Sequence, residues 1–180
     1  MFGTNLLVYQ KSFLNRLKKS DLEGTVSLER SLDMWGTGML ESMEMLPRGR
    51  FPYRLGKFYS KHPADRFFEE SCEGELRRGW HFHVDNYLNY LPAYCGGISL
   101  GDARNLESME DGIPLGDRPA LDAPTESLEH LYQLGEKFGY EEERGGYVSK
   151  CHLCLDIRRH LVEGTGRFKE LRPKEFYSRI

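Results

Sequence analysis

Hydrophobic residues recur every three or four positions in several stretches of the chain, the spacing of one buried face on an α-helix. Ser27 and Thr125 each come just before such a stretch, where a hydroxyl can accept hydrogen bonds from the first free amides of a helix. Gly36 and Gly139 come just after the same stretches and are typical of helix ends. We therefore predict helices at residues 7–19, 27–35, 64–70, 125–138, 155–164 and 173–177.

Two other segments alternate apolar and polar side chains, which is the two-residue period of a half-buried strand. Residues 40–46 form the first of them. The second is a predicted hairpin made of residues 80–85 and 90–95, with Asp and Asn in the turn between the two runs. Pro92 lacks an amide donor, so the return strand is expected at the edge of its sheet.

Two stretches are predicted to be loops. Residues 48–57 interleave basic and aromatic side chains, a combination that can bind nucleic acid, but a solvated loop is favoured in a chain without a basic excess. Residues 106–124 contain an Asp–Gly pair and three X–Pro pairs, which indicate a linker or a long loop.

Length and charge limit the class of protein. The chain has 180 residues, with 25 Lys and Arg against 28 Asp and Glu, so the net charge is −3. This length predicts one domain, or one domain and a tail. The charge balance predicts no nucleic-acid partner and no anionic membrane surface. No apolar run approaches the roughly 20 residues of a membrane-spanning helix, and residues 5–9 are too short for a signal peptide, so we expect a cytoplasmic protein.

The four cysteines are the most informative residues, because structural disulfides are disfavoured in a reducing compartment. Cys72 and Cys95 stand alone, whereas Cys151 and Cys154 form a Cys-x2-Cys pair. Four thiolates suit either tetrahedral zinc or an iron–sulfur cluster. Structural zinc sites more often use two close pairs, so a single pair favours a cluster. The alternative is that Cys72 or Cys95 is an ordinary buried thiol and the pair arises by chance.

A thiol–disulfide oxidoreductase is a second interpretation of the Cys151 and Cys154 pair, since a thiol at a helix N-terminus is activated. Thioredoxin-like folds place most of their sheet after this motif, and only residues 155–180 follow it here. His81 and His83 are secondary candidates for metal ligands, because residues two apart on a strand share a face.

Further polar residues lie around the pair. His152 is expected to point outward. Asp156, Arg158 and Arg159 either hydrogen bond to ligand sulfurs or a substrate carboxylate, or form a solvated helix face.

Residues 72–160 resemble the C-terminal auxiliary-cluster region, of the SPASM and twitch type, of radical S-adenosylmethionine proteins. The resemblance is carried by the run from His81 to Asp102, which reads His-Phe-His-Val-Asp through Pro-Ala-Tyr-Cys-Gly-Gly to Ser-Leu-Gly-Asp, and by the later Cys-x2-Cys. Residues 43–50 are similar to a late strand of the partial barrel of these enzymes. The resemblance implies an α+β fold in which residues 61–180 form a hairpin-centred cluster domain and residues 1–60 the tail of a partial α/β barrel.

The same resemblance implies that Cys72, Cys95, Cys151 and Cys154 hold one [4Fe–4S] cluster that relays electrons or holds substrate. The Cys-x3-Cys-x2-Cys motif that cleaves S-adenosylmethionine is absent, so we expect a separate or upstream radical core and no activity of this chain alone. Leu88 stands at a turn position where the family usually has glycine. The alternative function is a structural zinc module that binds a partner protein.

Overall fold

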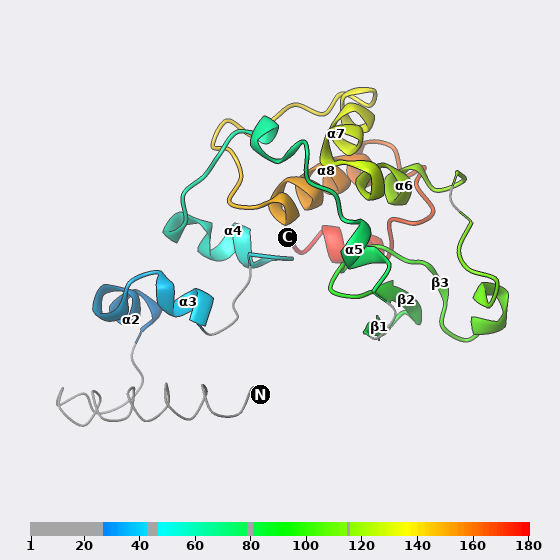
Figure 1. The fold of residues 1–180 in the computed structure, drawn as a ribbon, viewed down its shortest axis with the longest axis horizontal. Helices are drawn as coiled ribbons and strands as arrows, with labels where there is room; N and C mark the ends of the chain where they lie inside the picture. The colour runs from blue at the N-terminus through cyan, green and yellow to red at the C-terminus, as the bar shows by residue number, and fades with distance from the viewer. Residues whose placement is uncertain (1–26, 43–46, 79–80, 115) are drawn as a thin grey trace. The chain divides into compact units, whose positions relative to one another are not determined.

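The chain divides into two structural units, Met1–Met45 and Leu46–Ile180. The computed structural model describes residues 27–42, 47–78, 81–114 and 116–180 (Figure 1). The functional division expected between residues 60 and 61 remains a prediction, since compactness assigns no function to either unit. The predicted helix at residues 7–19, the strand residues 43–46 and Trp80 lie outside the described residues.

In the first unit, helix α2 (Leu28–Trp35) confirms the capping signals read from the sequence. The Ser27 hydroxyl accepts a hydrogen bond from the Arg30 amide at 3.2 Å, and Gly36 ends the helix with a φ of 71°. The strand predicted at residues 40–46 is wrong for residues 40–42, which belong to helix α3 (Gly38–Ser42). Leu, Met and Glu all favour helix, and so short an alternation does not outweigh that preference.

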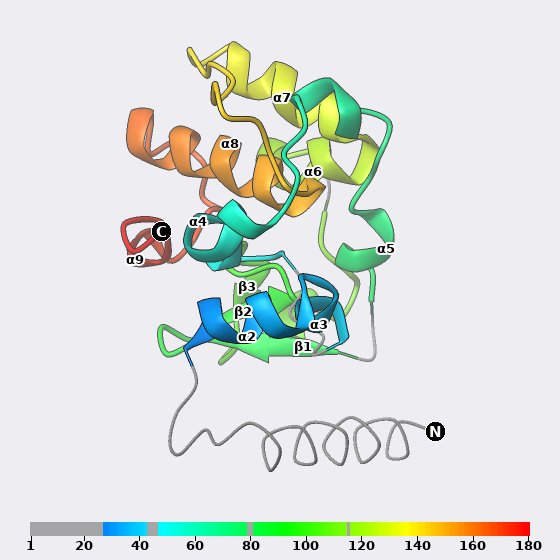
Figure 2. The ribbon, with the colours of Figure 1, turned by 90° about the vertical axis from the view of Figure 1, so that its left-hand side faces the viewer.

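In the second unit, helices α6 (Pro119–Glu126), α7 (Leu128–Glu136) and α8 (Lys150–Gly164) form the main helical layer. Helix α7 packs on both of the others. It approaches α8 closely at Gly135, where an added Cβ would lie 2.9 Å from the Ile157 Cγ2 atom. Figure 2 shows α8 between α7 and the small sheet. The buried residues of this layer include Leu128, Leu131, Leu153, Ile157 and Leu161.

The long loop predicted at residues 106–124 is wrong, because it contains a 3-10 helix, η3 (Leu106–Met109), and the start of α6. Pro119 lies in the first turn of α6, where its fixed φ suits a helix and its missing amide is not needed. Thr125 therefore lies within α6 rather than capping the next helix. Ser127 caps α7 instead and accepts a hydrogen bond from the His130 amide at 3.2 Å.

The predicted hairpin is confirmed as strands β1 (Phe82–Val84) and β2 (Asn89–Pro92), and β3 (Gly101–Asp102) adds a third antiparallel strand in the order β1-β2-β3. The expectation that β2 lies at an edge is wrong, because β2 is central. Pro92 pairs with Phe82 at the end of β2, beyond the residues that pair with β3, so its missing amide costs no bond to β3.

Shorter elements complete the second unit: α4 (Phe51–Leu55), η1 (Gly56–Phe58), η2 (Ala64–Phe67), α5 (Glu73–Leu76) and α9 (Lys174–Tyr177). The loop predicted at residues 48–57 is wrong, since α4 begins there with a proline in its first turn. The helix predicted at residues 64–70 is confirmed in part as η2, and the last predicted helix is confirmed as α9.

The mixture of helices with an antiparallel sheet confirms the α+β class, whereas the cluster-binding and partial-barrel parts of that expectation remain predictions. Within the part of the chain that the structure describes, each helix is too short or too polar to cross a membrane.

Candidate metal centre

The four cysteines lie in three separate segments of the second unit. Cys72 directly precedes α5, and its amide donates a hydrogen bond to the Pro124 carbonyl at 2.7 Å. Cys95 follows β2 in a turn, where its amide donates to the Pro92 carbonyl at 2.9 Å. Cys151 and Cys154 lie in the first turns of α8. These backbone bonds fix each thiol to the rigid helical and hairpin elements rather than to free loops.

Helix α8 starts earlier than the sequence predicted, at Lys150 rather than near residue 155. Ser149 caps it, accepting a hydrogen bond from the His152 amide at 3.2 Å and donating one to the Pro47 carbonyl at 2.8 Å. The Lys150 Nζ atom also donates to the Ser71 carbonyl at 3.0 Å, which links this helix start to the segment of Cys72. The Cys-x2-Cys pair is therefore carried by a helix and not by a turn.

The four thiols share one neighbourhood and none forms a disulfide. The pKa of Cys72 is raised chiefly by its hydrogen bond with Cys154 and secondly by burial. The same hydrogen bond lowers the pKa of Cys154. Burial raises the pKa of Cys95 to about 12 and that of Cys151 to about 11, and Cys154 adds to both shifts. The structure thus brings together all four residues that the sequence proposed, and Cys72 and Cys154 each interact with the other three.

This neighbourhood does not form a single-ion geometry. Among the described residues, no group of three or more His, Cys, Asp or Glu side chains is arranged to hold a metal ion. Zinc in a four-cysteine site needs every sulfur about 2.3 Å from one point. The thiols are close enough to influence one another's protonation.

Arg158 is a buried and permanently cationic residue that lies beside this site. Its guanidinium lies beside the Cys154 sulfur and helps to lower the pKa of that thiol. Its Nη1 atom donates to the Gly96 carbonyl at 3.1 Å and to the Tyr177 hydroxyl at 3.2 Å. Its Nε atom has no hydrogen-bond partner among the described residues. Both oxygen acceptors are neutral, so they leave the positive charge uncompensated.

The turn of Cys95 is closed from the far side by α9. The Tyr177 hydroxyl donates to the Gly97 carbonyl at 2.5 Å. A Cβ added at Gly97 would lie 2.5 Å from the Phe176 ring, and one added at Gly96 would lie 2.8 Å from the same ring. Gly97 also has a φ of 81°, which glycine adopts without strain. These two glycines let α9 pack closely against the turn that carries Cys95.

The two secondary candidates, His81 and His83, lie together. Their Nε2 atoms are 2.8 Å apart, and both rings lie against Tyr94. His83 is exposed on β1 and His81 immediately precedes that strand. The structure therefore pairs these imidazoles, as two positions on one strand face predict.

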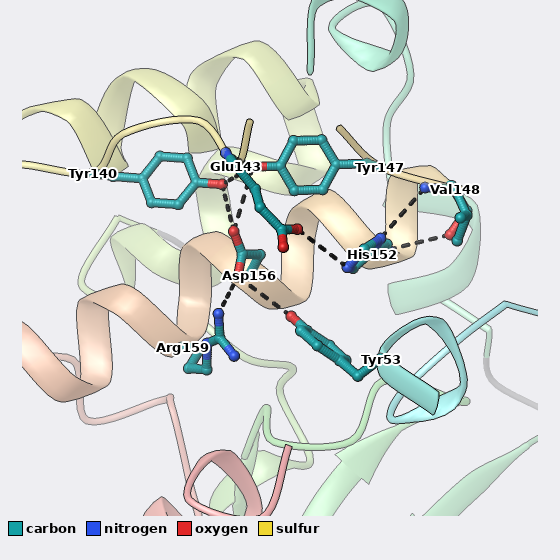
Figure 3. A network of polar contacts seen from close by, with 9 residues as sticks. Tyr53, Tyr140, Glu143, Tyr147, Val148, His152, Asp156 and Arg159 are labelled. Atoms are coloured by element: carbon teal, nitrogen blue, oxygen red, sulfur yellow. Dashed lines mark hydrogen bonds and ion pairs between the residues drawn. The ribbon is translucent and has the colours of Figure 1, made fainter. Parts of the chain in front are cut away.

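The other side of α8 carries His152, whose predicted outward orientation is wrong (Figure 3). His152 is 2% exposed, its Nδ1 atom accepts a hydrogen bond from the Val148 amide at 3.3 Å, and its ring packs edge-on against Tyr53 and Tyr147. Burial lowers the pKa of His152 to about 4. The imidazole is neutral and structural, facing away from the cysteine pair that flanks it in sequence.

Asp156 is the centre of a polar network that joins distant segments to α8 (Figure 3). Its carboxylate accepts hydrogen bonds from Tyr140 at 2.8 Å, Tyr147 at 3.3 Å and Tyr53 at 3.4 Å, and from Arg159 at 2.6 Å. The solvated helix face that the sequence allowed is thus wrong for Asp156 and Arg158, which are both buried. Sequence reasoning missed the three tyrosines, which share no spacing that would have grouped them.

Comparison of the chain with protein-family models, curated proteins and solved structures finds no match. The thiols, the buried guanidinium and the elements that hold them are therefore the features that bear on function.

Proposed function

We propose that Cys72, Cys95, Cys151 and Cys154 hold one [4Fe–4S] cluster. In this proposal the chain is the auxiliary-cluster portion of a cytoplasmic protein of the radical S-adenosylmethionine type. The observation that carries the proposal is the burial of Arg158 beside four mutually interacting thiols. A separate or upstream radical core would cleave S-adenosylmethionine, because the Cys-x3-Cys-x2-Cys motif for that step is absent from this sequence.

The charge of Arg158 supports an anionic centre. Burying an unpaired guanidinium costs several kcal/mol, and the nearest carboxylate in sequence, Asp156, pairs with Arg159 instead. A thiolate at Cys154, which Arg158 favours, would compensate that charge. Thiols that coordinate a metal are deprotonated outright, so a centre ligated by four thiolates carries net negative charge. Arg158 would then neutralise part of a buried anion, and each group would stabilise the other.

The sequence spacing of the four cysteines favours a cluster over a single ion, because structural zinc sites more often use two close pairs and this chain has one. The alternative function is a structural zinc module that binds a partner protein, in which the same four thiols would hold the ion.

The thioredoxin-like alternative has no support in the protonation of its first thiol. An attacking cysteine needs a depressed pKa, whereas the pKa of Cys151 is raised by burial to about 11.

When bound, a cluster supplies one-electron transfer. The chain's own residues do the rest: burial of Cys72 and Cys154 excludes water, and Arg158 favours the thiolate form at Cys154. The Cys95 turn is held in place by its contacts with α8 and α9. A site of this kind fits either of the two roles expected for it, electron relay or substrate holding.

The test is metal analysis of the full chain expressed and purified without oxygen. We expect about four irons and four sulfides per chain, with brown colour and a visible charge-transfer band. Stoichiometric zinc in a colourless protein would favour the zinc alternative, and protein without either would contradict both. A double variant, His81→Asn with His83→Asn, is the matched control and should keep the full iron content if the four cysteines are the ligands.

A further inference from the structure

A cavity of about 340 Å³ lies on the second unit, away from any cysteine in its lining. It is bounded by the hairpin turn, by β3, by the segment that precedes α6, and by the segment between α8 and α9. Basic residues are unusually frequent around it. The charged and aromatic residues of its wall that matter here are Tyr87, Arg104, Arg118, Lys169, Glu170 and Arg172.

Two of these side chains already interact with other groups of the protein. Arg104 forms an ion pair with Asp102 at 2.6 Å. Glu170 is 2% exposed, and its Oε1 atom accepts a hydrogen bond from the Ala120 amide at 2.8 Å, so its carboxylate serves the start of α6. Asp102, which also lines the cavity, offsets Arg104, but the Ala120 amide is neutral, so the negative charge of Glu170 stays in the wall with the charges of Arg118, Lys169 and Arg172.

Arg118, Lys169 and Arg172 outnumber the Glu170 carboxylate, so these four side chains give the wall a net charge of 3 − 1 = +2. The Arg118 Nη1 atom donates to the Leu100 carbonyl at 2.5 Å, a neutral acceptor that holds the guanidinium in the wall. Lys169 and Arg172 have no ion-pair partner among the residues that the structure describes. Like charges that converge on one concave site repel one another unless an anion lies between them. In a chain of net charge −3, this concentration is a local reversal of sign.

We propose that this cavity binds a small molecule through an oxyanion, a phosphate or a carboxylate group. Arginine donates hydrogen bonds in pairs to such groups and lysine adds a point charge, so Arg118, Arg172 and Lys169 form a suitable set of donors. The volume exceeds that of the anion alone and leaves room for an attached skeleton beside the ring of Tyr87, which is 46% exposed. The site is independent of the cysteine centre and of what that centre holds.

The test uses the full chain and two simple probes, inorganic phosphate and succinate. Each is titrated at constant ionic strength while the melting temperature is followed, because a ligand that binds only the folded state raises it. Binding should appear with at least one probe, and the stronger of the two identifies which oxyanion the site takes. Isothermal titration calorimetry with the same probe then gives the dissociation constant.

Charge variants locate the binding. The double variant Lys169→Gln with Arg172→Gln should weaken binding about tenfold or more, since it removes two charge-assisted contacts. Arg167→Gln with Lys174→Gln is the matched control, because it removes the same charge from exposed neighbours outside the wall. That control should change the dissociation constant by less than about twofold. Equal weakening in both variants, or no binding of either probe, overturns the proposal.

Discussion

The guanidinium of Arg158 lies beside the sulfur of Cys154 within the protein interior, where the two residues are only 5% and 6% exposed. Neither can be removed without leaving its neighbour in an unsuitable environment. The permanently charged guanidinium requires a nearby anion, and the thiol is the side chain beside it that can become one.

Arg158→Met tests this relationship. We expect loss of most of the bound metal, together with a decrease of about 3 kcal/mol in the free energy of unfolding, because the counter-charge of the centre disappears. Metal analysis and denaturant unfolding measure the two effects. Arg159→Gln is the control, since Arg159 contacts Asp156 on the other side of α8 and should leave the metal content unchanged. Full metal retention in Arg158→Met would contradict the proposed role.

Cys154→Ser is expected to be the most severe of the four cysteine substitutions, because Cys154 is buried, interacts with the other three thiols and also contacts Arg158. Both metal content and stability should fall, as ligand binding and folding are coupled at such sites. Cys151→Ser, at a partly exposed position, should lose the metal with a smaller loss of stability measured on the metal-free chains. Unchanged metal content in either variant would remove that residue from the ligand set.

The tyrosines predict an alkaline pH dependence. Burial raises the pKa of Tyr147 and Tyr177 to about 12, and it also raises the pKa of Tyr53 and Tyr140 above the ordinary value near 10. Because the folded state favours the protonated phenol, the resulting stability is fully present below pH 10 and is lost as the pH rises through about 12. At about pH 11, tyrosinate absorbance should therefore report at least four of the ten tyrosines as still protonated. Titration of all ten together near pH 10 would contradict this environment.

Leu88 has a φ of 62° in the hairpin turn, a conformation that costs a non-glycine residue about 1 kcal/mol or more. Leu88→Gly should therefore raise the free energy of unfolding by about 0.5–1 kcal/mol, measured by chemical denaturation. Tyr87→Gly next to it is the control and should lower stability, because Tyr87 does not share the positive φ. A lower stability of Leu88→Gly would contradict this prediction. It would show that the contacts of the Leu88 side chain stabilise the fold by more than its positive φ costs.

Gly135→Ala and Gly74→Ala should have opposite effects, although both glycines lie in helices. An alanine Cβ at residue 135 would lie 2.9 Å from Ile157 and 3.1 Å from Tyr140, which forces α7 away from α8, so we expect a loss of about 1–3 kcal/mol. Nothing lies within 4 Å of the same atom at Gly74, where alanine should add about 0.5 kcal/mol through helix propensity. Thermal unfolding of the two variants is a sufficient comparison.

Local signals in the sequence predicted the elements that have explicit start and stop residues. Ser27 and Gly36 bound α2 because a hydroxyl cap and a positive-φ glycine act over a few residues. Proline was the main source of error. Pro119 marks a loop by its usual interpretation, yet it begins a helix, because the first turn needs no amide from it.

The candidate site could be predicted only in part. The four cysteines stand out by residue type, and their proximity follows the expected convergence of hairpin and Cys-x2-Cys segments. The buried partners of Arg158 could not be predicted. Gly96 and Tyr177 come from other segments, and no spacing or residue type in the sequence links them to Arg158. The same holds for the three tyrosines around Asp156, which come from three separate parts of the chain.

The four cysteines lie in segments that the ribosome synthesises at different times. A ribosome that adds about 5–20 residues per second needs on the order of ten seconds to pass from Cys72 to Cys151. Throughout that interval Cys72 and Cys95 have neither the start of α8 nor Arg158 beside them. A four-thiolate centre therefore cannot assemble before the start of α8 has been synthesised.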